Sequence, residues 1–134
     1  MIESHFIKYN NLKDDIRYKN MELIKLKEDL KTLTGVSYDK LKVKGGVNIT
    51  MEDKLHVIIE KEKQLQKLYD SYNELRAKHE SEIDRIQDGT KRFILKSFYL
   101  DRCTIKEIAV TLEKSCGHIK KLKRWAVAEF ERGL

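Results

Sequence analysis

Basic side chains near the end of the chain have the types and spacing needed to bind a polyanion. Four of them occur within five residues of a predicted helix: Lys120, Lys121, Lys123 and Arg124. Lysine can donate to O6 and N7 of guanine at a base edge, and both lysine and arginine bind backbone phosphates. We expect Lys120 and Lys121 to lie nearest the base edges. Lys123 and Arg124 are expected to meet phosphates.

The first turn of the same helix extends the predicted DNA-binding set. Ser115 is a good N-cap residue, so the helix should begin directly after it. A glycine in this turn costs helix propensity but permits a close approach to a groove floor. The complete predicted set is Ser115, Cys116, Gly117, His118, Lys120, Lys121, Lys123 and Arg124.

A second, shorter helix is predicted immediately before this one. Thr104 and Glu107 have the T-x-x-E spacing of a capping box, in which each side chain bonds the backbone N–H of the other. Cys103 and Ile108 occupy the positions of a hydrophobic staple around the box. A polar break at Glu113 and Lys114 separates the two helices. A short helix, a tight turn and a longer basic helix are typical of a helix-turn-helix, which places its second helix in the DNA major groove.

The distribution of charge supports a nucleic-acid partner. Residues 90–134 contain eleven Lys and Arg against five Asp and Glu, a balance of +6 that equals the net charge of the whole chain. The remaining segments cancel: residues 1–33 have +1, 34–49 have +2 and 50–89 have −3. Excess positive charge concentrated in one segment is the pattern expected for phosphate binding.

The segment that precedes the basic helices begins with a heptad repeat. Apolar residues occupy most positions of its a series (Ile2, Tyr9, Ile16, Leu23, Leu30) and its d series is His5, Leu12, Lys19, Leu26, Leu33. This spacing predicts one long helix with a coiled-coil seam. We expect it to end at Thr34-Gly35, where glycine suits the position after a helix.

A second long helix is expected after a polar linker at 34–49. Thr50 with Asp53 suits its start, and its apolar spacing continues to about Gln87, before a break at 88–90. A helix over 91–100 should follow, with Trp125 packed against it. The predicted fold is therefore all-α, with a helical arm or hairpin in 1–89 and a helix-turn-helix domain in 90–134.

Neither long helix can bury its apolar stripe alone. The sequence leaves open whether the two helices pair within one chain or between chains. Pairing within one chain is favoured because the linker keeps both helices together, and a homo-oligomer, with a dimer favoured, is also expected.

Several classes of function find no support in the sequence. It has no phosphate loop or nucleophile elbow, and Cys103, Cys116 and His118 lack the spacing of a zinc site. We therefore expect a non-enzyme with no cofactor and no metal. No apolar run of about 20 residues could span a bilayer and the N-terminus resembles no signal peptide, so a cytoplasmic protein is expected.

The C-terminal residues resemble region four of bacterial sigma factors. The shared pattern consists of Leu95, Tyr99, Thr104, Glu107, Ile108, Ala109, Ser115, Ile119 and Ala126. Two long helices followed by such a region resemble phage-encoded regulators of the ArpU/RinA type, and this resemblance implies activation of late prophage genes. Cys116 and Gly117 stand where sigma factors have Arg and Glu, which implies a different DNA preference. Nothing resembles sigma region two, which opens promoters.

Two alternatives remain beside a DNA-binding transcription regulator. A small terminase subunit also combines a helix-turn-helix with helical oligomerisation elements, so a DNA-packaging factor is the main rival. An adaptor whose arm contacts host RNA polymerase is the third. The operator, and whether regulation is positive or negative, are open.

Overall fold

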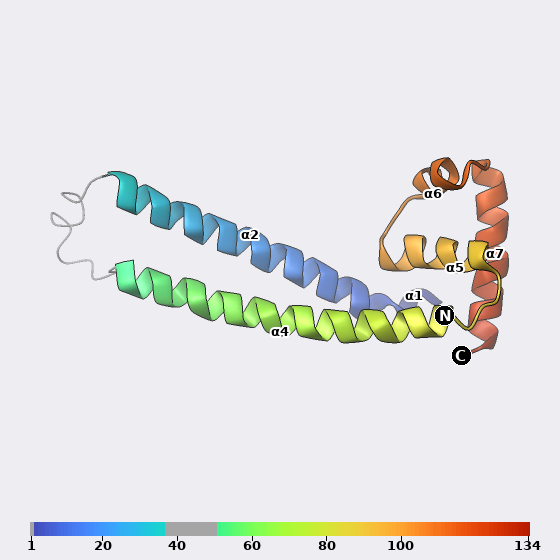
Figure 1. The fold of residues 1–134 in the computed structure, drawn as a ribbon, viewed down its shortest axis with the longest axis horizontal. Helices are drawn as coiled ribbons and strands as arrows, with labels where there is room; N and C mark the ends of the chain where they lie inside the picture. Colours follow the sequence, from blue (N-terminus) through green and yellow to red (C-terminus); the bar gives the residue numbers. More distant parts are fainter. Residues whose placement is uncertain (1, 37–50) are drawn as a thin grey trace. The chain divides into compact units, whose positions relative to one another are not determined.

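The computed structural model describes residues 2–36 and 51–134, and within these ranges the chain forms helices and no strands (Figure 1). This confirms the predicted all-α class. The elements are α1 (Ile2–His5), α2 (Ile7–Val36), α4 (Met51–Ile83), α5 (Gly89–Leu95), the π-helical turn η1 (Lys96–Leu100), α6 (Ile105–Leu112) and α7 (Cys116–Arg132). None of the helices in the described ranges is both long and apolar enough to cross a membrane.

The chain divides into two compact units. Unit 1 contains Met1–Leu12 and Tyr72–Leu134, and unit 2 contains Lys13–Ser71. The division differs from the predicted one at residue 89, because the first residues of the chain and the end of α4 share a core with the C-terminal helices. Most of the linker expected at 34–49, and the proposed cap at Thr50, lie outside the described residues.

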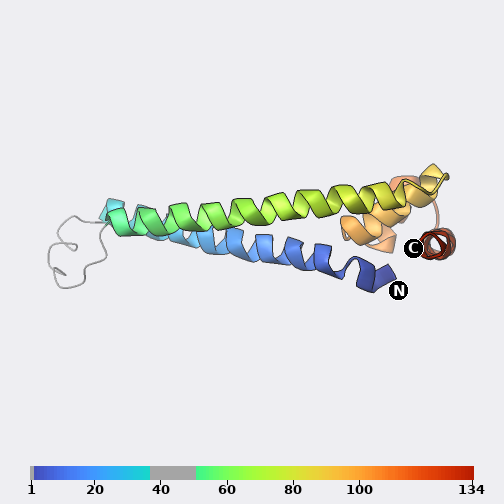
Figure 2. The ribbon, with the colours of Figure 1, turned by 90° about the horizontal axis from the view of Figure 1, so that it is seen from below.

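Unit 2 is an antiparallel pair formed by parts of α2 and α4, which lie side by side in both views (Figures 1 and 2). The two helices therefore pair within one chain. Four buried residues line their contact: Ile16, Leu23, Ile58 and Leu65. Polar contacts flank it, with Lys61 Nζ 3.3 Å from Glu22 Oε2 and Asn20 Nδ2 donating to Tyr69 Oη over 3.1 Å.

The N-terminal helix is interrupted at Phe6, whereas the heptad predicts an unbroken helix. α1 ends at His5 and α2 begins at Ile7. The Phe6 side chain is completely buried, with its ring 5.4 Å from that of Tyr99 and 5.5 Å from that of Phe130. A local departure from helical geometry thus accompanies the insertion of an aromatic ring into the core of unit 1.

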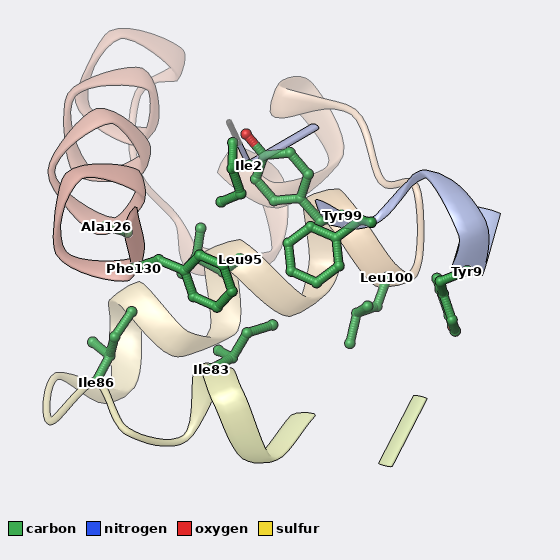
Figure 3. Packing of buried hydrophobic residues seen from close by; sticks show 10 residues of the cluster. Ile2, Tyr9, Ile83, Ile86, Leu95, Tyr99, Leu100, Ala126 and Phe130 are labelled. Carbon is green, nitrogen blue, oxygen red and sulfur yellow. The ribbon is translucent and has the colours of Figure 1, made fainter. Parts of the chain in front are cut away.

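The core of unit 1 joins residues from both ends of the described sequence, some of them more than 100 positions apart (Figure 3). It consists of Ile2, Phe6, Tyr9, Ile83, Ile86, Leu95, Tyr99, Leu100, Ala126 and Phe130. Heptad position a supplies Ile2 and Tyr9, as the repeat predicts. Phe6 lies between α1 and α2, and the remaining members come from α4, the turn after it, α5, η1 and α7. The first residues of the chain therefore belong to this unit.

A hydrogen-bonded arginine lies beside this core. Arg76 donates from Nη1 to Tyr9 Oη over 2.8 Å and to Asp101 Oδ1 over 2.9 Å, and from Nε to Glu80 over 2.6 Å. Tyr9 Oη in turn donates to Tyr72 Oη over 2.9 Å. We call Arg76 and these four partners the Arg76 network. Burial is the main cause of a raised pKa at the Tyr9 hydroxyl, which therefore stays protonated.

Two predicted helix ends differ from the observed ones. Gly35 was expected just beyond the first long helix but lies inside α2, which ends at Val36. The second helix ends at Ile83 rather than near Gln87. After it, the Arg92 guanidinium donates to the carbonyl oxygens of Ile86 and Gln87 over 2.6 and 2.7 Å, which stabilises a turn there.

The helix predicted over 91–100 is present as α5 and η1. Asp88 accepts a hydrogen bond from the Thr90 N–H, so α5 begins at the predicted break. In η1 the Asp101 N–H donates to the carbonyl of Lys96, five residues earlier, over 3.0 Å. The chain then turns sharply at Arg102, a non-glycine residue with φ of 55°, and continues into α6.

Candidate nucleic-acid interface

The start of α6 is stabilised by the predicted capping box. Thr104 has extended backbone angles, and its hydroxyl accepts from the Glu107 N–H over 3.1 Å. Glu107 Oε1 accepts from the Thr104 N–H, also over 3.1 Å. These bonds satisfy two backbone donors that helix geometry leaves unpaired. The backbone and side chain of Thr104 together lower the pKa of the Glu107 carboxyl.

A turn of three residues joins α6 to α7. Glu113 adopts the left-handed conformation with φ of 55°, and the Lys114 N–H donates back to the Ala109 carbonyl over 3.0 Å. Ser115 then caps α7, because its hydroxyl accepts from the His118 N–H over 3.1 Å. Both helix starts therefore agree with the sequence-based prediction.

A small apolar cluster holds α6 against α5 and α7. Its buried members are Ile94, Ile108, Ala109 and Ile119, and the surrounding half-buried side chains are Phe98, Cys103, Ile105, Leu112 and Leu122. Cys103 and Ile108 belong to the same cluster, as expected for a hydrophobic staple across the capping box. The side chains that pack α6 against α7 are thus different from the exposed basic side chains of α7.

The exposed face of α7 gathers three of the predicted basic residues. Successive helical residues are about 100° apart, so Lys120, Lys121 and Arg124 lie about 100 to 160° from the buried Ile119. All three side chains are exposed, and so is Gly117 on the same face. A Cβ placed on Gly117 would meet no atom within 4 Å. We call Gly117, Lys120, Lys121 and Arg124 the α7 basic face.

Trp125 flanks this face and is partly exposed at the surface. It is 46% exposed and does not belong to either apolar cluster described for unit 1. The Lys121 ammonium lies 5.1 Å from the centre of its ring, within the range of a cation–π contact. The packing of Trp125 against the 91–100 helix stays a prediction. Its indole is available at the surface beside a cation.

Lys123 lies apart from the other basic residues of α7. Its ammonium is 3.7 Å from the ring centre of Phe98 and 5.6 Å from that of Tyr99, so it points toward η1. Burial lowers the pKa of this ammonium, while the carboxylate of Glu3 opposes the shift. Lys123 therefore lies nearer the packed side of α7 than Lys120 and Arg124, and it lines one surface hollow together with them.

The remaining predicted residues have different surroundings. The Ser115 hydroxyl accepts from the backbone as a cap. Cys116 and His118 are exposed in the first turn of α7, and Cys103 and Cys116 are free thiols. The exposed predicted residues nearest the α6–α7 turn therefore combine a thiol, a glycine and an imidazole with the cations that follow.

Sequence reasoning missed one polar cluster, which we call the histidine cluster: His5, His79 and Glu82. His79 Nδ1 lies 2.7 Å and His5 Nε2 lies 2.9 Å from Glu82 Oε1. The spacing of His79 and Glu82, three residues apart on α4, places them on one helix face and was visible in the sequence. The approach of His5 was not, since 74 residues separate it from His79.

Comparisons with protein-family models, with curated proteins and with solved structures find no match to this chain.

Proposed function

We propose that this chain is a sequence-specific DNA-binding transcription regulator in which α6 and α7 act as a helix-turn-helix. The observation that carries the proposal is the α7 basic face. Three exposed cations lie in the first half of α7, together with a glycine whose added Cβ would meet nothing within 4 Å. A three-residue turn joins α7 to the shorter, capped helix α6. A helix end of this kind suits the major groove, where lysine donates to guanine and arginine reaches phosphate or base.

Charge and packing support the same proposal. The +6 balance of residues 90–134 is the excess charge of the chain, and the side chains of the α7 basic face take no part in either apolar cluster. Positive groups that are not needed for folding are free to replace condensed counterions on DNA. Within this proposal Lys123 contributes to packing beside Phe98 rather than to a base contact.

The biological role follows from the resemblance to ArpU/RinA-type regulators. We infer a phage or prophage regulator of late genes that binds double-stranded DNA in the cytoplasm and acts without catalysis. Contact with host RNA polymerase belongs to the same proposal. Exposed apolar side chains in unit 2, including Met21 and Ile24 at 58% and 57% exposure, favour self-association through that unit.

The groove assignment is tested by binding of α7 variants to genomic DNA fragments in a fluorescence anisotropy titration. Lys120→Ala and Lys121→Ala should each weaken specific binding by about 1–3 kcal/mol. Arg124→Ala should weaken all sequences and reduce the slope of log affinity against log salt by about 1. Lys78→Ala on α4 removes the same charge elsewhere and is the matched control. Unchanged affinity in the double variant of Lys120 and Lys121 contradicts the proposal.

The second candidate is a DNA-packaging factor of the small-terminase type. The exposed apolar side chains of unit 2 favour it as well, since they suit any assembly of several copies. Molecular mass in solution distinguishes the candidates, because a regulator should be a monomer or dimer and a terminase subunit should form a ring of about eight or more copies. Sedimentation equilibrium with and without DNA gives this mass directly.

A further inference from the structure

The histidine cluster brings together three side chains that can bind a metal. His79 and Glu82 belong to α4 and His5 ends α1, and one potential ligand atom from each lies within 4.8 Å of the other two. Among residues 2–36 and 51–134, no other three His, Cys, Asp or Glu side chains meet in this way. All three belong to unit 1.

The surroundings of the cluster resemble those of a metal site more than those of a surface ion pair. His79 is 2% exposed, and its ring lies 4.7 Å from the ring of Phe6 and 6.0 Å from that of Tyr9. His5 and Glu82 retain 25% and 15% of their side-chain exposure. The cluster is therefore closed by aromatic rings on the side of His79 and open to solvent near His5 and Glu82.

The side chains of the cluster have the chemistry of metal ligands. Burial is the main cause of a lowered pKa at His79. Burial raises the pKa of the Glu82 carboxyl, but hydrogen bonds from His5 and His79 outweigh this and lower it. Two imidazoles and an ionised carboxylate are ligands that zinc accepts.

One atom of the cluster is unsatisfied. His79 Nε2 is buried and has no hydrogen-bond partner, while Nδ1 faces Glu82. Metal binding at Nδ1 moves the ring proton to Nε2 and leaves that nitrogen as unpartnered as before. Coordination therefore replaces the hydrogen bond to Glu82 without creating a further unsatisfied buried atom.

We propose that His5, His79 and Glu82 form a binding site for Zn²⁺, with water as the fourth ligand on the exposed side. Ligand bonds of about 2.0–2.2 Å in a tetrahedron place ligand atoms about 3.3–3.5 Å apart. The present separations of 2.7 and 2.9 Å must widen by about 0.4–0.8 Å. His5 and Glu82 can supply this movement because both are partly exposed.

Such a site would fasten the N-terminus of the chain to the core of unit 1. His5 lies next to Phe6, and its ring is 5.6 Å from that of Phe130 at the end of α7. A metal held by His5 and by α4 would therefore fix α1 over the base of the helix that bears the α7 basic face. The site is structural in character, and its existence does not depend on the proposed binding of DNA.

The test is a calorimetric titration of the chelator-treated 134-residue chain with Zn²⁺ alone, in a Cys116→Ser background that removes the exposed thiol. We expect one Zn²⁺ per chain and a higher Tm in the metal-bound form. His5→Gln and Glu82→Gln should each weaken binding at least tenfold, roughly the lower limit for loss of groups that support a metal. His56→Gln and His118→Gln, which remove exposed histidines elsewhere, should leave the affinity unchanged.

Cobalt provides a spectroscopic control, because Co²⁺ bound by nitrogen and oxygen in a tetrahedral site absorbs in the visible range without a thiolate charge-transfer band. Far-ultraviolet circular dichroism verifies that the variants are folded. Binding that persists in His5→Gln or Glu82→Gln, a thiolate band, or the absence of stoichiometric binding would each overturn the proposal. In the last case the three side chains form hydrogen bonds with one another and bind no metal.

Discussion

The two units of the chain contain similar helices but bury their side chains very differently. In unit 1, Phe6, Leu95 and Leu100 are completely inaccessible, whereas among residues 13–31 and 51–71 of unit 2 no side chain falls below 5% exposure. Unit 2 also exposes many large apolar side chains, namely Tyr18, Met21, Ile24, Met51, Leu55, Val57, Ile59 and Tyr69. Two helices side by side can each cover only one stripe of the other. Unit 1, with helices crossing from several directions, encloses its core.

Similar amphipathic patterns thus lead to different energetic roles in the two units. The stability of unit 1 should come from its own core. Unit 2 should depend on whatever covers its second apolar face, which we propose to be another copy of the chain. Matched substitutions in the two units should therefore lower stability by different amounts.

We expect the largest loss of stability when a core leucine is shortened, and one such substitution in each unit tests the difference in packing. Leu95→Ala removes a completely buried side chain and should lower the free energy of unfolding by about 3–5 kcal/mol. Leu65→Ala, at 8% exposure in the α2–α4 pair, should cost about 2 kcal/mol because that site can relax toward solvent. Urea unfolding followed by circular dichroism gives both values. Equal losses would remove the distinction between the units.

Polar contacts provide the next test. Arg76→Met breaks three bonds of the Arg76 network beside the core of unit 1, and should cost about 2 kcal/mol. Lys61→Met removes an exposed pair with Glu22 in unit 2 and should cost about 0.5 kcal/mol or less. Thermal melts in low and high salt measure the two effects. A larger loss of stability for Lys61→Met than for Arg76→Met would contradict the proposed difference between the two units.

A smaller effect is expected at the capping box of α6. Thr104→Ala should lower the free energy of unfolding by about 1 kcal/mol, since the Glu107 N–H loses its acceptor. Glu107→Ala should act similarly, and the double variant should lose less than the sum because the two bonds are reciprocal. DNA affinity should fall only as far as folding does. If Glu107→Ala abolishes DNA binding with an unchanged Tm, Glu107 contacts the partner directly.

The smallest expected effect is on the pH dependence of stability through Glu107. The pKa of the Glu107 carboxyl is lowered in the folded protein by its bonds with Thr104, so the ionised form is favoured by folding. This contribution is fully present above the pKa of glutamate in the unfolded chain and is lost as the pH falls through the lowered value. Glu107→Gln should therefore show a shallower loss of stability between neutral and acidic pH than the parent protein. If stability falls with pH equally in Glu107→Gln and in the parent protein, the bond between Glu107 and Thr104 does not depend on the charge of the carboxylate.

Local patterns predicted the helix starts, and long-range packing explains what they did not predict. Thr104 and Ser115 act as caps through bonds within three residues, so their sequence context is sufficient. The interruption at Phe6 coincides with the entry of its ring into a core built from distant segments, and no local pattern contains that core. The approach of His5 to Glu82 has the same origin.

Two other surprises were accessible from helical geometry alone. Lys123 is about 40° from Ile119 around α7, and therefore faces inward despite its charge. Trp125 is about 120° from Ile119 and therefore faces outward despite its size. Residue type suggested the opposite in both cases. The position of a side chain around the helix axis was the better guide.

Gly117 gives the α7 basic face a capacity to change. Because no atom lies within 4 Å of where its Cβ would be, this position accepts larger side chains without disturbing the packing of unit 1. Alanine there should even favour the helix by about 1 kcal/mol. Under the proposed DNA binding, folding and recognition would be separable along α7. A lineage, or a randomised library over positions 116, 117, 120 and 121, could then change the DNA sequence preference while the scaffold keeps its stability.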